Sequence, residues 1–201
     1  MTFNDILMSA VSKSINDYLR KHTDDKTTKS VCMACPFSLR PPPKTLGDFT
    51  FNNDFSIVPL NLRLIDNYDT GLHQINSDMN VMKKSISPIV LAYLLKLVMM
   101  LPEFLRAYLN EDLSNKMTFG FSNVPGPKTP YKCAGSETKS LSFIMPVGKT
   151  VVGSFSIISH AKVVKMAVVM DKATMPSVSP LAEILKNNLD EVLGGPKWRL
   201  F

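Results

Sequence analysis

Residues 152–170 read VGSFSIISHAKVVKMAVVM, and this stretch does most to decide the fold. Two runs of apolar and β-branched residues, 152–159 and 163–170, stand on either side of His160-Ala161-Lys162. Two such runs separated by a few residues are typical of a β-hairpin. The stretch therefore predicts two strands that pair with each other.

The residues around this hairpin predict a mixed architecture. Short apolar runs predict strands, and apolar residues at steps of three and four predict helices. Further strands are expected at 31–37, 55–60, 117–124 and 140–145, and helices at 5–19, at 72–86, from Pro88 to near Asn110, and from Ser179 to Val192. Helices and strands are interspersed in the first half, and strands are consecutive in the second. This order favours an α/β (α+β-like) fold, with a mixed β-sheet flanked by helices.

The most apolar run of the chain is 89–101, which is interrupted only by Lys96 and followed by Pro102. Thirteen residues are too few to cross a bilayer, which needs roughly 20. We expect a core helix here. The alternative is a helix that contacts a membrane or a partner protein.

Composition narrows the class of protein. The chain has 201 residues, of which 45% are apolar and 20% charged, so we expect a single globular domain over 1–201. The net charge of +6 comes from basic residues that are scattered, which argues against nucleic-acid binding. This charge suits an anionic lipid surface, but it is equally typical of the surfaces of unrelated cytosolic domains. Three cysteines are too few for a disulfide scaffold, and the first 20 residues lack the pattern of a secretory signal. We therefore expect a cytoplasmic protein.

The cysteines and histidines do not predict an active site. Cys32 and Cys35 have the spacing of a zinc or redox motif, but on a strand these two positions face opposite sides, and no second ligand pair follows. His22, His73 and His160 have no acidic or histidine partner at a catalytic spacing, so we expect solvated side chains. No catalytic residue, metal or bound cofactor is expected in this chain.

The motif that stands out is Phe121-Ser122-Asn123-Val124-Pro125-Gly126-Pro127, in which a strand runs into a turn. Proline fixes φ and glycine permits positive φ, so this turn is expected to have one shape. It either simply ends the strand or also positions Ser122 and Asn123 towards a channel or a reacting oxygen.

With this motif the chain resembles the C-terminal domain of the bacterial-type wax ester synthase and acyl-CoA:diacylglycerol acyltransferase family. Ser122–Pro127 is similar to the family's Thr/Ser-Asn-Val-Pro-Gly-Pro. Asn4-Asp5 resembles its Asn-Asp motif at the start of the first helix, and 36–40 resembles a strand end that closes on Arg40. The chain departs from the family at Asn52-Asn53, where the family has Gly-Asn.

The resemblance implies half of a chloramphenicol acetyltransferase-like fold, in which two similar halves meet around a tunnel. It implies acyl transfer from acyl-CoA, as co-substrate, to a long-chain alcohol or diacylglycerol, with peripheral contact with endoplasmic reticulum or lipid-droplet membranes. The family's general base lies in a His-His-x-x-x-Asp-Gly motif, and no two histidines of this chain are adjacent. We therefore expect an N-terminal catalytic half as partner. The alternative is a catalytically inactive structural or regulatory module that binds a partner protein, lipid or membrane. The residues expected at the substrate channel or at the interface between the halves are Asn4, Asp5, Arg40, Ser122, Asn123, Pro125, Gly126 and Pro127.

Overall fold

The computed structural model describes residues 1–40, 45, 54–146, 148, 150–161 and 163–194, and the backbone of 198–200. Asn52-Asn53, used in the family comparison, and Lys162, in the predicted hairpin turn, lie outside the described residues. The main sheet consists of β1 (Ser30–Ser38), β2 (Phe55–Arg63), β3 (Phe119–Val124), β6 (Gly153–His160), β7 (Val163–Met170) and β8 (Trp198–Leu200).

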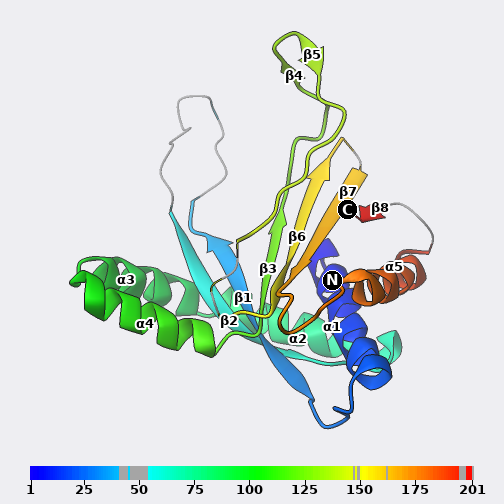
Figure 1. Ribbon diagram of the computed structural model, residues 1–201. Coiled ribbons are helices and arrows are strands. Elements are labelled where there is room, and N and C mark those ends of the chain that lie inside the picture. Colours follow the sequence, from blue (N-terminus) through cyan, green and yellow to red (C-terminus); the bar gives the residue numbers. More distant parts are fainter. Residues whose placement is uncertain are drawn as a thin grey trace.

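The sheet is mixed, in the order β2-β1-β3-β6-β7-β8 (Figure 1). Its central strands β1, β3 and β6 run parallel to one another. On either side, β2 is antiparallel to β1 and β7 is antiparallel to β6, and β8 runs parallel to β7. The predicted hairpin is confirmed, with Gly153 opposite Met170 and His160 opposite Val163.

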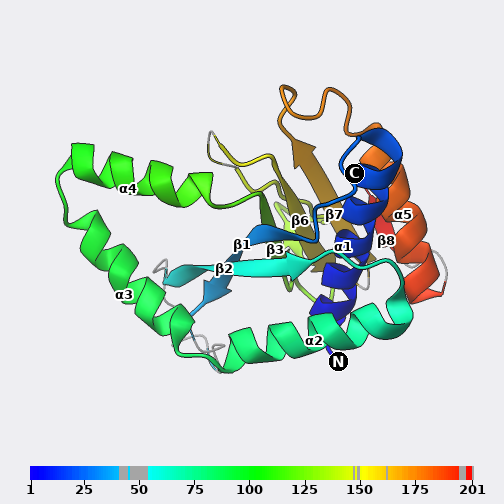
Figure 2. The same cartoon turned by 90° about the horizontal axis from the view of Figure 1, so that it is seen from below.

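The helices are α1 (Phe3–His22), α2 (Tyr68–Lys84), α3 (Ser87–Met99), α4 (Glu103–Asn115) and α5 (Ser179–Leu193). Helices α1 and α5 pack against each other beside the sheet, and α2 crosses α1 (Figures 1 and 2). Helix α3 lies next to the edge strand β2 and leads away from α2, and α4 runs back towards β3 (Figure 2).

The core lies between α1, α5 and the sheet face that these helices cover. Apolar residues at helical spacing on α1 and α5 face the sheet. Burial alternates along β1 and β2, whereas β6 is buried on both sides. The side chains buried there include Leu7, Val11, Ile15, Met33, Leu60, Phe121, Phe155, Ile157, Leu181, Leu185 and Leu189. Burial of this apolar set is the main contribution to stability.

The prediction of one continuous helix from Pro88 to near Asn110 is wrong. The segment forms two helices, because Pro102 lacks the N–H that an uninterrupted helix requires, and α4 begins directly after it. Burial differs from expectation as well. Of the thirteen residues of α3, Pro88 and Ala92 alone are buried, so α3 is not a core helix.

The strand predicted at 140–145 is also absent from the described structure. Met145 of this segment is joined to β6 by hydrogen bonds to serine side chains and not by a backbone ladder. The Met145 N–H donates to Ser156 Oγ at 2.9 Å, and Ser154 Oγ donates to the Met145 carbonyl at 3.0 Å. Serine hydroxyls can take the place of backbone partners, which apolar patterning does not reveal.

A small hairpin, β4 (Lys132–Cys133) and β5 (Ser136–Glu137), was not expected from the sequence. It turns at Ala134 and Gly135, which have φ angles of 49° and 82°. Asn-Gly is the strong sequence signal for such a turn, and Ala-Gly is a weak one. Strand β8 was not expected either.

Candidate functional site

The first turn of α1 meets the end of β3. Asn123 Nδ2 donates a hydrogen bond to Asn4 Oδ1 at 3.2 Å, and both side chains are half-buried. The contact joins two motifs that are 119 residues apart in the chain. It lies by the edge where the parallel strands β1, β3 and β6 end, which is where open α/β sheets commonly hold ligands. Side-chain amides donate and accept hydrogen bonds but do not take up protons, so this pair can orient a substrate but cannot act as a general base.

Asp5 follows Asn4 and is fully buried. Its carboxylate accepts hydrogen bonds from the Thr2 backbone N–H at 2.7 Å, from Asn76 Nδ2 at 2.7 Å and from Lys83 Nζ at 3.0 Å. Burial acts to raise the pKa of Asp5, but the hydrogen bonds from Thr2, Lys83 and Asn76 outweigh it and hold this pKa below its ordinary value. The ionised carboxylate therefore ties the start of α1 to α2, and indirectly holds Asn4 in place.

The turn after β3 packs against the turn of the β6–β7 hairpin. The Gly126 N–H donates to Ser159 Oγ at 3.1 Å, and the Ala161 N–H donates to the Pro127 carbonyl at 3.0 Å. A Cβ atom on Gly126 would lie 1.9 Å from the Ser159 carbonyl oxygen. Gly126 does not have a positive φ, contrary to expectation, so close backbone approach is the reason for glycine here. Pro125 is exposed at the start of this turn.

His160 was expected to be solvated, and this expectation is wrong. The residue ends β6 and is only 4% exposed, and the ring of Tyr131 contacts it edge-on at 5.9 Å between centroids. Within the described part of the chain, its Nε2 has no hydrogen-bond partner. A buried aromatic ring therefore links the β4–β5 segment to the end of β6.

Ser122 and Asn123, which were expected to act together, lie on opposite faces of β3. Phe121 and Asn123 face α1, so strand alternation turns Ser122 to the other face, where Ser156 of β6 is its neighbour in register. Arg40 lies just beyond β1 with an exposed side chain. Since β1 and β3 are parallel, Arg40 and Asn123 belong to the same edge of the sheet.

The other histidines and cysteines stand apart from this edge. His22 stacks on Tyr18 at 5.0 Å, and His22 and His73 are both exposed. Cys35 is buried and Cys32 half-buried, and burial, with the charge of Cys32, raises the pKa of the Cys35 thiol to about 12. A thiol that stays protonated is a poor nucleophile and metal ligand. Within the described ranges, no group of three or more His, Cys, Asp or Glu side chains is arranged to hold a metal ion.

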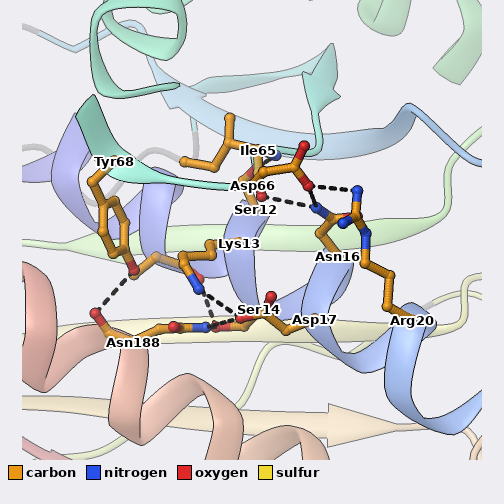
Figure 3. Close-up of polar contacts among 11 residues, drawn as sticks. Ser12, Lys13, Ser14, Asn16, Asp17, Arg20, Ile65, Asp66, Tyr68 and Asn188 are labelled. Carbon is orange, nitrogen blue, oxygen red and sulfur yellow. Dashed lines mark hydrogen bonds and ion pairs between the residues drawn. The ribbon is translucent and has the colours of Figure 1, made fainter. Parts of the chain in front are cut away.

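A polar cluster that was not expected from the sequence joins α1 to α5 (Figure 3). Asn188 of α5 donates to Ser14 Oγ at 3.0 Å and to Asp17 Oδ2 at 3.1 Å, and Asp17 also pairs with Lys13 at 2.8 Å. The Tyr68 hydroxyl donates to the Asn188 carbonyl at 2.9 Å. Burial, followed by the charges of nearby carboxylates, raises the pKa of Tyr68, so the phenol keeps the proton that it donates.

A second part of the same cluster joins α1 to the segment between β2 and α2 (Figure 3). Asn16 Nδ2 donates to the Ile65 carbonyl at 3.0 Å and to Asp66 Oδ1 at 2.8 Å, and Arg20 pairs with the same Asp66 oxygen at 2.5 Å. The Ile65 N–H donates to Ser12 Oγ at 3.1 Å. These contacts satisfy buried polar groups and set the position of α1, on which Asn4 and Asp5 depend.

An open groove of about 690 Å³ lies between β2, the end of α2 and the start of α3. Its volume is in the range of pockets that hold small ligands. Its walls are mostly apolar and include Val58, Leu60, Val81, Met82, Ile86, Val90 and Leu91. In the described part of the chain, no helix combines the length and apolar character needed to cross a membrane.

Comparison with solved structures places this fold among known ones. A wax ester synthase/diacylglycerol acyltransferase from Marinobacter aquaeolei VT8 is similar over 96% of this chain and 43% of its own, with a TM-score of 0.59 and 16% identity. The epimerization domain from the third module of tyrocidine synthetase B matches 96% of this chain and 42% of its own, with a TM-score of 0.48 and 14% identity. This chain thus spans less than half the length of either structure. The first likeness agrees with the expected chloramphenicol acetyltransferase-like half, a mixed sheet flanked by helices.

Comparison by sequence assigns the family. No curated protein sequence matches the chain significantly. The family model of the WS/DGAT C-terminal domain matches residues 52–192, which is more than half of the chain and includes the Asn-Val-Pro-Gly-Pro motif at 123–127. The resemblance inferred from the motifs is thereby confirmed, and the chain belongs to the WS/DGAT C-terminal domain family.

Proposed function

We propose that this chain forms the C-terminal half of a lipid O-acyltransferase, which transfers an acyl group from acyl-CoA to a long-chain alcohol or to diacylglycerol. The observation that carries the proposal is the family match over 52–192. The fold supports it, because the similar structure is named a wax ester synthase/diacylglycerol acyltransferase. The hydrogen bond between Asn4 and Asn123 brings the two motifs that resemble those of the family, Asn4-Asp5 and Ser122–Pro127, next to each other.

The proposed reaction needs a general base, and this sequence does not contain the family's motif for it. The hydroxyl oxygen of the acceptor attacks the thioester carbonyl carbon, the carbon–sulfur bond breaks, and the base carries the hydroxyl proton to the departing thiolate of CoA. The family's base is a histidine in a His-His-x-x-x-Asp-Gly motif, and no two of the three histidines here are adjacent. In this proposal a companion N-terminal half supplies the base, and Asn4 and Asn123 help to orient the reactants beside it.

The test is to co-express residues 1–201 with an N-terminal half from the same family. Ester formation is then measured with long-chain acyl-CoA and either a long-chain alcohol or diacylglycerol in detergent. We expect turnover by the pair and a loss on the order of tenfold to hundredfold for Asn123→Ala or Asn4→Ala. Asn187→Ala is the matched control, because Asn187 is exposed on α5, and it should retain full activity.

The competing function is an inactive structural or regulatory module, which the lack of adjacent histidines favours. A stable complex of the two halves without ester formation supports that function and contradicts ours. Turnover by residues 1–201 alone also contradicts the proposal, because the base would then have to come from this chain.

A further inference from the structure

We infer that the groove between β2, the end of α2 and the start of α3 binds an extended peptide segment, which adds a strand to the edge of the main sheet. This β2 groove has a volume of about 690 Å³ and touches four consecutive residues of the strand, from Val58 to Asn61. Successive residues of a strand face opposite sides, so the groove runs along the edge of β2 rather than over one face. Strand β2 ends the order of the sheet, so among the described residues no further strand covers this edge.

The register of the sheet shows which backbone groups of β2 face the free edge. At one end of the β1–β2 pairing, the Leu39 N–H donates to the Asp54 carbonyl at 3.2 Å. At the other end, the Leu64 N–H donates to the Lys29 carbonyl at 2.9 Å. In an antiparallel ladder every second residue bonds the partner strand, so the even-numbered residues of β2 bond β1. The odd-numbered residues therefore direct their backbone N–H and C=O groups outward.

The outward residues beside the groove are Ile57, Pro59 and Asn61. Among the described residues, no hydrogen bond takes up the N–H of Ile57 or of Asn61. Pro59 has no N–H, and at an outward position this does not weaken the pairing with β1. Ile57 and Asn61 are four residues apart, about 13 Å along the strand. The edge therefore offers two donors and three carbonyl acceptors at the spacing that a second strand matches.

The walls of the β2 groove fit apolar side chains. Val81, Ile86 and Val90 line it and are 70%, 71% and 45% exposed, where the turn between α2 and α3 lies beside β2 (Figure 2). Asp78 also lines the groove, and Arg63 of β2 matches its charge at 3.1 Å. A strand in the groove would direct every second side chain to these walls, so we expect apolar residues at alternate positions of the bound segment.

The backbone groups favour a peptide over an alkyl chain as the occupant. An alkyl chain along this edge would cover the N–H groups of Ile57 and Asn61 without bonding them, and a buried donor without an acceptor is costly. A peptide strand supplies the acceptors. Because Pro59 has no donor, the bound strand makes fewer hydrogen bonds than in a full ladder, and contacts with the apolar walls contribute the rest of the affinity.

The experiment is fluorescence anisotropy of residues 1–201 with a labelled eight-residue peptide. Valine and threonine alternate in this probe between a terminal lysine and a terminal glutamate, because both residue types favour strands and the valines then share one face. We expect saturable binding. Val81→Glu and Val90→Glu should each lower the affinity by about tenfold or more, because a charge enters an apolar wall.

Two modified peptides test the backbone pairing. One carries N-methyl groups on its valines and the other on its threonines, and each pattern removes the donors from one edge of the strand. A bound strand has only one edge against β2. One pattern should therefore lower the affinity by about tenfold, and the other should leave it nearly unchanged. Equal affinities of the two modified peptides contradict strand addition.

Ile144→Glu is the matched control, because Ile144 is 65% exposed and does not line the groove. It should leave peptide binding unchanged, and circular dichroism checks that all variants fold. Equal binding by Val81→Glu, Val90→Glu and the unsubstituted chain contradicts the inference, and so does a lack of saturable binding. If a labelled long-chain alcohol binds and Val81→Glu weakens it, while the peptide does not bind, a lipid is the occupant and the inference is wrong.

This inference goes beyond acyl transfer and does not depend on it. Peptide binding is measured without substrate and without a companion half. Ester formation by the two halves with no peptide binding contradicts strand addition alone. Peptide binding with no ester formation contradicts the proposed function alone.

Discussion

Asp5 stabilises the start of α1, next to Asn4 of the candidate site. Its buried carboxylate accepts three hydrogen bonds, one of them from the charged Lys83. We expect Asp5→Asn to lower the free energy of unfolding by about 2 kcal/mol, because the amide loses the charge that Lys83 pairs with. Urea unfolding at neutral pH measures the change. Asp24→Asn is the control, because Asp24 is exposed, and an equal loss there would contradict the assignment.

The same carboxylate predicts a pH dependence. The pKa of Asp5 is lower in the folded chain than its ordinary value of 3.8. Its contribution to stability is therefore complete above about pH 4 and is lost as pH falls through the folded-state pKa. Between neutral pH and pH 3, the stability of Asp5→Asn should fall less than that of the unsubstituted chain. Parallel stability curves for the two proteins would contradict this account.

At the scale of elements, the contact between α1 and α5 depends on Asn188. This side chain is 4% exposed and donates to both Ser14 and Asp17. Asn188→Leu leaves both acceptors without this donor, and we expect a loss of about 1–3 kcal/mol in the free energy of unfolding. Thermal unfolding checks it. The neighbouring Asn187 is exposed, so Asn187→Leu should change stability by at most about 0.5 kcal/mol, and similar losses for both variants would contradict the role of the cluster.

At the scale of the whole molecule, stability should be uneven. Helices α1 and α5 pack in the core, and α4 has no buried residue. Amide hydrogen exchange of the free chain should therefore be fastest in α4 and slowest in α1 and α5. Mass spectrometry of exchange resolves the helices. Equal protection of α4 and α1 in the free monomer would contradict this distribution of stability.

Local patterns account for what sequence analysis predicted well. The helix at 5–19 and the strands at 152–159 and 163–170 correspond to α1, β6 and β7. Each of these elements packs apolar side chains into the core, so its apolar spacing reports the structure directly. The same reasoning failed for 89–101, where apolar residues predicted a core helix and the structure exposes most of them. Hydrophobicity shows that a segment needs an apolar environment but not which molecule provides it.

The sequence by itself determined the family, through Ser122–Pro127 within the matched residues 52–192, and the mixed sheet with flanking helices. Only the tertiary structure decided that Asn4 contacts Asn123, that Ser122 faces the opposite side of the sheet, and that His160 is buried and contacts Tyr131. The physical reason is distance along the chain. Hydrophobic period and turn chemistry act over a few residues, whereas these placements depend on how α1, β3 and β6 pack after they form.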